Sequence, residues 1–163
     1  MDAGLVLVDV RQAVPDDWTA IAGLLAELGR PDVLASDDEE PARSLFLEYL
    51  GRQDAVALVA VDGDRAIGFC DVEFRPRLNY ATPEAWIPDL IVAEGDRSRG
   101  AGAALLKRAE ELAEERRCWA ISLESANWRT RAHAFYEREG WEDTAHAFVK
   151  VLGDVAWPPA PKS

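Results

Sequence analysis

Hydrophobic residues recur at helical spacing in four segments of the chain. In the first, which Pro15 opens and Gly29 closes, they lie three or four residues apart. These positions are Trp18, Ile21, Leu24, Leu25 and Leu28. The same spacing returns over 42–50, over 102–116 and over 129–139. The pattern therefore predicts four helices of ordinary length.

Shorter apolar runs bounded by turn residues predict the strands. The runs are 5–11, 55–61, 65–74, 86–93, 118–123 and 145–152. Asp62-Gly63-Asp64 lies between the second and third runs, and this sequence is typical of a hairpin turn. The resulting order, β-α-α-β-β-β-α-β-α-β, predicts an α/β domain built around a mixed sheet.

Length and composition narrow the picture to one globular domain. The chain has 163 residues, and we expect one domain over 1–153, followed by a flexible, proline-rich tail over 154–163. No apolar run reaches the ~18 residues that would cross a bilayer, and no secretion signal is recognisable at the N-terminus. Cys70 and Cys118 lie in apolar runs without metal-ligand spacing, so we expect reduced thiols, no metal site and a cytoplasmic protein.

Charge distinguishes between classes of partner. With 18 Lys and Arg against 30 Asp and Glu, the net charge is −12. Such an acidic chain argues against a nucleic-acid partner. The negative charge could attract a cationic substrate, or it could contribute to solubility alone.

The segment 91–106 carries the clearest chemical signal. An apolar run that can form a strand ends at Ala93, and a turn follows that contains Arg97, Arg99, Gly100 and Gly102. The first turn of a helix has N–H groups without intrahelical partners, and the helix dipole adds partial positive charge there. Glycines let an anion approach the backbone closely. The segment therefore predicts a phosphate site at a helix N-terminus.

Three kinds of phosphate ligand compete for this turn. A Walker A loop would need Gly-Lys-Ser/Thr, which the chain lacks. A dinucleotide fingerprint would need a small residue at position 105, where Leu105 stands. The pyrophosphate of coenzyme A is the third candidate.

Two motifs resemble the GNAT family of N-acetyltransferases. The segment 97–102 resembles the Arg/Gln-x-x-Gly-x-Gly/Ala signature of the family, and Ala132-His133-Ala134-Phe135-Tyr136 resembles its Ala-His-x-Phe-Tyr block. The resemblance covers about residues 5–152 in element order. It implies the GNAT fold, a mostly antiparallel mixed sheet of about six to seven strands with a splayed central pair and about four flanking helices. It also implies an acyltransferase that uses acetyl-CoA as co-substrate.

The resemblance also implies roles for individual residues. The backbone of Leu90, Ile91 and Val92 would pair with the pantetheine arm. The pyrophosphate would lie on Arg97, Ser98, Arg99, Gly100, Ala101, Gly102 and Ala103. Asn127 and Phe135 complete the expected cofactor-binding set, with Ser125 as an alternative to Asn127. Tyr136 would be the general acid that protonates the leaving thiolate.

The acceptor half of the site rests on Asp89. An amine is protonated at neutral pH, and a carboxylate can bind the ammonium and take its proton. Asp89 lies in the apolar run 86–93, on the same face as Ile91, and a backbone N–H near Ile91 would stabilise the oxyanion. A structural Asp that bonds nearby backbone is the alternative.

The expected reaction is direct acetyl transfer to a primary amine of a small cationic molecule. The spacing from Ser125 to His133 resembles enzymes that acetylate aminoalkylphosphonates, and 86–90 resembles aminoglycoside acetyltransferases. A protein N-terminal or lysine amine and a non-catalytic CoA-binding module are alternatives. Family members are often dimers, so a homodimer is an open expectation, as is a longer acyl donor.

Overall fold

The computed structural model describes residues 8–154, which form a six-stranded sheet flanked by helices. The strands are β1 (Asp9–Gln12), β2 (Ala55–Asp62), β3 (Arg65–Arg75), β4 (Glu84–Ile87), β5 (Leu90–Val92) and β6 (Ala120–Leu123). The α-helices are α1 (Trp18–Leu28), α2 (Glu39–Leu50), α3 (Ala101–Glu115) and α4 (Thr130–Arg138). Two 3-10 helices, η1 (Pro15–Asp17) and η2 (Glu94–Arg99), precede α1 and α3. This is the mixed α/β fold that the pattern predicts.

The sheet runs in the order β1-β2-β3-β4-β6, and β5 also pairs with β3. The pairs β1–β2, β2–β3, β3–β4 and β3–β5 are all antiparallel. β4 and β5 thus lie along the same edge of β3, one after the other. β6 continues the sheet from β4 and not from β5, so within residues 8–154 β5 pairs with β3 alone.

The predicted single strand over 86–93 is wrong. The structure divides this run into β4 and β5, with Pro88 and Asp89 between them. Proline has no N–H to give to a ladder, so a sheet interior tolerates it only at an edge or an irregularity. The interruption leaves Asp89 just before β5 and not inside a regular strand.

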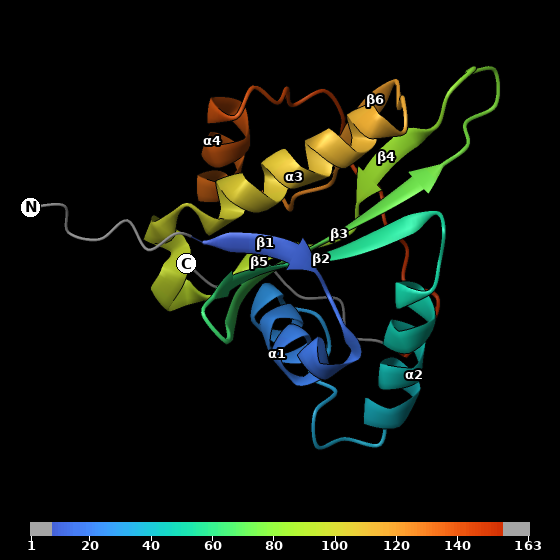
Figure 1. Ribbon diagram of the computed structural model, residues 1–163. Helices are drawn as coiled ribbons and strands as arrows, with labels where there is room; N and C mark the ends of the chain where they lie inside the picture. The colour runs from blue at the N-terminus through green and yellow to red at the C-terminus, as the bar shows by residue number, and fades with distance from the viewer. Residues whose placement is uncertain (1–7, 155–163) are drawn as a thin grey trace, which may run out of the picture. The chain divides into compact units, whose positions relative to one another are not determined.

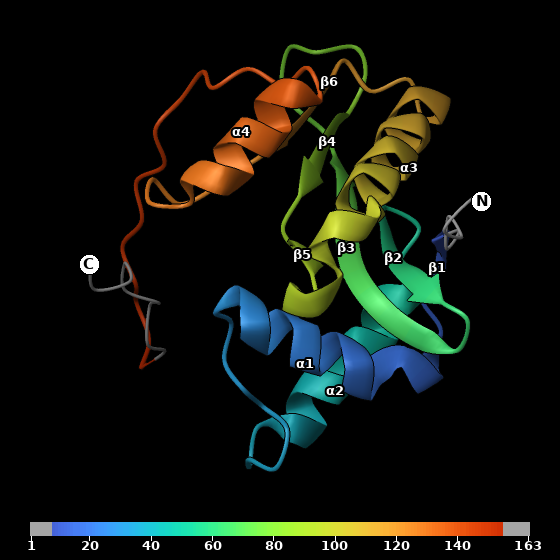
Figure 2. The ribbon, with the colours of Figure 1, turned by 90° about the vertical axis from the view of Figure 1, so that its left-hand side faces the viewer.

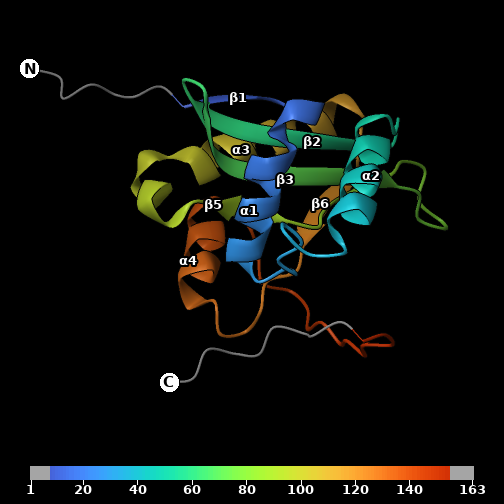
Figure 3. The same cartoon turned by 90° about the horizontal axis from the view of Figure 1, so that it is seen from below.

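Helices cover both faces of the sheet within residues 8–122. α1 and α2 lie on one face, and α3 lies on the other (Figure 1). Seen from below, α1 lies against β3 and β5, and α2 lies over β2 (Figure 3). Among residues 8–154, none of these helices has the length and apolar character of a transmembrane segment.

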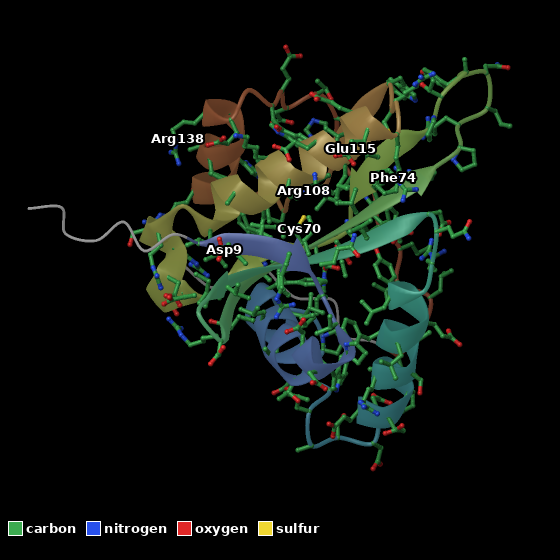
Figure 4. All side chains as sticks on the ribbon, in the orientation of Figure 1. Asp9, Cys70, Phe74, Arg108, Glu115 and Arg138 are labelled. Atoms are coloured by element: carbon green, nitrogen blue, oxygen red, sulfur yellow. The ribbon has the colours of Figure 1, made fainter. Side chains whose placement is uncertain are left out.

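Strand alternation explains which side chains meet which helices. Phe69 of β3 and Ile91 of β5 join the core beneath α1, together with Ile21. Cys70, the next residue along β3, lies on the face turned toward α3 (Figure 4). Asp71 therefore shares the α1 and α2 face with Phe69.

α3 packs closely on the strand that pairs with β5. A Cβ on Gly68 would lie 3.0 Å from Cδ1 of Leu105 and 3.3 Å from the carbonyl oxygen of Ile91. Leu105 is fully buried. Gly68 thus lets the helix and β5 approach β3 together. On the outer face of α3, Arg108 donates to Glu115 at 3.2 Å (Figure 4).

Several predicted elements differ from the structure. α2 begins at Glu39 and not at residue 42, because Glu39 and Glu40 are favourable in the first turn of a helix. The predicted strand over 145–152 is not formed in the structure, and Phe148 is 97% exposed there. An isolated run cannot form a strand without a partner for its backbone groups. The first predicted strand begins at Asp9, and its residues 5–7 lie outside the described part.

The chain divides into two compact units between Ser122 and Leu123. The first unit contains the helices and strands up to the start of β6, and the second contains α4. A single acetyltransferase domain over 1–153 remains a prediction. Of the predicted flexible tail, 154–163, all but Asp154 lies outside the described residues.

Candidate active site

The interruption between β4 and β5 presents a backbone edge and a carboxylate side by side. The N–H of Asp71 donates to the carbonyl of Asp89 at 3.2 Å, and the N–H of Ala93 donates to the carbonyl of Ile67 at 2.8 Å. Hydrogen-bonded positions alternate along an antiparallel pair. The backbone groups of Leu90 and Val92 therefore face away from β3.

This register refines the prediction for the pantetheine arm. Leu90 and Val92 have outward-facing N–H and C=O groups, as a strand-like ligand would need. The backbone of Ile91 faces β3, and its side chain is buried in the core. An oxyanion donor near Ile91 stays a prediction, and the outward-facing N–H groups on either side of Ile91 are those of Leu90 and Val92.

The turn after β5 leads directly into α3 (Figure 2). Gly100 adopts φ 79° and ψ 10°, a left-handed backbone conformation that residues other than glycine rarely adopt. α3 then begins with Ala101, Gly102 and Ala103, whose N–H groups belong to the first helical turn. Because no bulky side chain covers the N-terminus of α3, its free N–H groups are accessible, and this arrangement fits a pyrophosphate.

The two arginines of the turn have different environments. Arg97 is exposed, and its Nε donates to the carbonyl of Val92 at 3.4 Å. Arg99 donates through Nη1 to Asp62 at 2.8 Å and to Asp96 at 3.1 Å. Its Nη2 is buried without a partner among the described residues. Arg99 therefore braces the turn, and its predicted contact with phosphate stays a prediction.

Asp96 is the centre of this bracing network. It is 7% exposed and also accepts two hydrogen bonds from Arg65, at 3.0 and 3.1 Å. The Arg65 hydrogen bonds, followed by those of Arg99, hold the pKa of Asp96 below its usual range. The network ties the turn to the β2–β3 hairpin through Asp62 and Arg65.

Asp89, the predicted base, has a cationic partner that is distant in sequence. Arg30, which follows α1, donates through Nε to Oδ1 of Asp89 at 2.7 Å and through Nη2 to the carbonyl of Pro88 at 3.1 Å. The Asp89 side chain is 15% exposed. The pair orients the carboxylate at the interruption.

Asp71 is a second carboxyl at this position, and sequence analysis missed it. It is 8% exposed, and its Oδ1 accepts the N–H of Asp89 at 2.7 Å. Burial raises the pKa of Asp71 well above its usual range, and the neighbouring Asp89 carboxylate raises it further. A charged residue in the apolar run 65–74, on the same face as Phe69, was the signal that could have identified it.

Tyr49 of α2 is the other group that the sequence did not indicate. Its hydroxyl oxygen is buried without a hydrogen-bond partner among residues 8–154. Burial raises the pKa of Tyr49. The α1 and α2 face of the sheet thus holds several polar groups near the interruption.

The remaining predicted residues lie in the second unit. Asn127 is exposed in the segment before α4, and Phe135 and Tyr136 are half-buried on α4. The Tyr136 ring lies 5.3 Å from the Phe135 ring and 5.9 Å from the Trp141 ring, centroid to centroid. The carbonyl of Tyr136 accepts the N–H of Trp141 at 2.9 Å, which closes α4 beside Gly140. Tyr136 as general acid and Asn127 and Phe135 as cofactor contacts stay predictions.

Comparisons with known proteins find similar sequences and similar structures. A model of the acetyltransferase (GNAT) family matches residues 18–141. The chain is 26% identical to an uncharacterized N-acetyltransferase of Bacillus subtilis over 138 residues, 83% of this chain and 91% of the relative. It is also 26% identical to an aminoalkylphosphonate N-acetyltransferase of Salmonella typhimurium over 144 residues, 88% and 91% of the two chains. The crystal structure of a Bacillus halodurans protein described as a transcriptional regulator superposes with a TM-score of 0.78, at 27% identity, over 90% of this chain and all of that one.

The chain belongs to the acetyltransferase (GNAT) family, and its fold is the GNAT fold. It is an acetyl-CoA-dependent N-acetyltransferase. Two features fit this co-substrate. The outward-facing edge of β5 offers backbone groups for strand-like pairing, and the start of α3, with its small residues, offers free N–H groups to a diphosphate.

Proposed function

We propose that this protein transfers an acetyl group from acetyl-CoA to a primary amine of a small cationic molecule, by direct attack in a ternary complex. The observation that carries the proposal is the carboxylate of Asp89, the residue just before β5. Asp89 directly precedes Leu90, whose backbone faces the edge proposed for the pantetheine arm. An ammonium bound by Asp89 would therefore lie beside that edge.

Asp89 has two tasks in this proposal. Its carboxylate binds the ammonium group and then takes a proton from it, which frees the nitrogen lone pair for attack. Arg30 orients the carboxylate through the 2.7 Å ion pair. An outward-facing N–H of Leu90 or Val92 stabilises the developing oxyanion.

The co-substrate half of the proposal uses the turn and α4. Acetyl-CoA, when bound, supplies the activated acetyl thioester. Arg97, Ser98 and the N–H groups from Gly100 to Ala103 bind its pyrophosphate, while Arg99 braces the turn. Tyr136 protonates the thiolate that leaves, and Asn127 and Phe135 contact the co-substrate.

The class of acceptor is supported by charge and by similarity. The net charge of −12 favours a cation over an anion in the field of the protein. The Salmonella typhimurium relative is named for an aminoalkylphosphonate, which carries a primary amine. The net charge supports a cationic acceptor, and the name of the relative supports a primary amine on a small molecule.

A screen of amines with acetyl-CoA tests the proposal. Thiol release and the mass of the product are followed for an aminoalkylphosphonate, a polyamine, an aminoglycoside and a peptide with free N-terminal and lysine amines. We expect saturable turnover with at least one of the free small amines. Turnover of the peptide alone would instead support a protein acetyltransferase, and acetyl-CoA binding without any turnover would support a CoA-binding module.

Asp89→Asn checks the role of the carboxylate in that screen. We expect kcat/KM to fall by about 10²–10⁴-fold at neutral pH, the range for a positioned acid or base. Asp64→Asn, the same charge change on an exposed hairpin residue, is the matched control. Equal activity and equal pH–rate profiles of wild type and Asp89→Asn would refute the assignment.

We also propose that the protein is cytoplasmic and that it forms a homodimer. Cys70 and Cys118 are free thiols in the structure, which fits a reducing compartment. Light scattering of the purified protein decides between monomer and dimer.

A further inference from the structure

Asp71 and Asp89 face each other directly across two antiparallel strands. The backbone contact between them at 3.2 Å places them opposite one another in the extension of the β3–β5 ladder. Side chains directly opposite on one face lie ~4.5–5.5 Å apart at Cβ, and two like charges there are destabilising. Oδ1 of Asp71 also accepts a hydrogen bond from the N–H of Asp89 at 2.7 Å.

The surroundings of the two carboxyls differ in one decisive respect. Asp89 has the Arg30 guanidinium at 2.7 Å. Asp71 is 8% exposed, and none of the ion pairs formed within residues 8–154 supplies it with a cation. Two adjacent carboxyls in a buried site cannot both be ionised without a large cost. The proton therefore resides on the carboxyl that lacks a cation.

The other ionisable groups around the pair do not supply the missing charge. From β3, Glu73 lies on the same face and is paired with Arg52 at 3.3 Å. From α2, the Tyr49 hydroxyl is buried, and burial keeps it neutral. Cys70 lies on the opposite face, and burial raises the pKa of its thiol.

We propose that Asp71 and Asp89 hold one proton between them at neutral pH, so that Asp71 is a neutral carboxylic acid and Asp89 is the carboxylate that binds the acceptor amine. Asp71 is then a positioning residue that acts through Asp89. Its carboxyl holds the Asp89 backbone and donates its proton toward the Asp89 carboxylate. The amine-binding part of this inference rests on the proposed function, whereas the shared proton does not.

The proton transfer balances in a simple way. One N–H bond of the ammonium breaks, an O–H bond forms on Asp89, and the electron pair stays on nitrogen. The nitrogen lone pair attacks the thioester carbonyl and forms a C–N bond, and the C–S bond breaks as the carbonyl forms again. The sulfur keeps that electron pair and takes a proton from Tyr136, and the nitrogen gives its second proton through water to the Tyr136 phenolate. Asp89 returns its proton to water, while Asp71 keeps its own throughout.

Infrared spectroscopy and activity together test this inference. Difference spectra of wild type and Asp71→Asn at pH 7 report protonated carboxyl groups, with exposed Asp64→Asn as the control. We expect wild type and Asp64→Asn to show a protonated carboxyl band that Asp71→Asn lacks. Because asparagine resembles a neutral carboxylic acid, we expect Asp71→Asn to keep kcat/KM within about tenfold of wild type at neutral pH, whereas Asp89→Asn loses about 10²–10⁴-fold. We further expect a limb of the wild-type pH–rate profile on the alkaline side to disappear in Asp71→Asn.

Two results would overturn the shared proton. One is the absence of the band from wild type at pH 7, and the other is its persistence in Asp71→Asn. If Asp71→Asn fails to fold, carbon-13 NMR titration of the aspartate carboxyls in wild type gives the same decision without a variant. If no amine is turned over, the proposed function fails, but the spectroscopic result still decides the protonation of the pair.

Discussion

Arg99 is bound to Asp96 at 3.1 Å inside the turn that connects β5 with α3. The same guanidinium reaches Asp62 at 2.8 Å, on the β2–β3 hairpin. A turn that must present several N–H groups to one diphosphate benefits from such bracing, because a cradle that is already ordered loses less entropy on binding.

The two arginines of the turn should respond differently to substitution. We expect Arg99→Gln to lower the melting temperature, because it removes a partner from the buried carboxylate of Asp96. We expect Arg97→Gln to leave the melting temperature unchanged and to weaken acetyl-CoA binding by about tenfold, about 1.4 kcal/mol, with a smaller salt dependence. Calorimetric titration and thermal unfolding measure both. The reverse pattern, with Arg97 needed for stability and Arg99 dispensable, would contradict the structure.

Substitution of Gly100 should reduce stability and acetyl-CoA binding because of its backbone conformation. Its φ of 79° lies in the left-handed region, although a Cβ there would meet no atom within 4 Å. We expect Gly100→Ala to destabilise the fold by about 1–2 kcal/mol and to reduce acetyl-CoA affinity. Gly95→Ala is the matched control, because Gly95 lies in the same turn, is equally uncrowded and has no positive φ. Equal losses in both variants would show that conformation is not the cause.

Asp71 should make the free energy of unfolding fall as the pH rises. Its pKa is raised in the folded state, so between the unfolded value of about 3.9 and the folded value the folded protein binds more protons. This contribution makes the free energy of unfolding fall as pH rises above about 4. Asp71→Asn removes it, so we expect the variant to gain stability relative to wild type from about pH 4 to about pH 7. Urea unfolding at several pH values measures the difference, and a constant difference would argue against a raised pKa.

Tyr136 should affect turnover far more than binding. We expect Tyr136→Phe to lower kcat by about 10²–10⁴-fold and to leave the affinity for acetyl-CoA nearly unchanged, because only the phenolic proton is lost. Steady-state kinetics and calorimetric titration separate these effects. Tyr80→Phe, which changes a half-exposed tyrosine stacked on Trp119, is the control. Wild-type turnover in Tyr136→Phe would remove the residue from the mechanism.

Local chemistry explains which predictions from sequence were confirmed. The helix over 18–28, its end at Gly29 and the α3 helix follow from spacing and from a glycine with φ 100°. The hairpin at Gly63 is equally local. The run 86–93 was predicted as one strand because periodicity does not register the effect of Pro88, and the run 145–152 was predicted as a strand because alternation does not show whether a partner exists.

The amino-acid sequence alone determined the family, the four helices and the glycine-containing turn before α3, because each depends on residues that are close together in the chain. Only the tertiary structure showed which groups surround Asp89. Arg30 lies 59 positions from Asp89, and Asp71 lies 18 positions from it. The charge on each group depends on burial and on neighbours that the strand register brings together, and neither quantity is defined until the chain has folded.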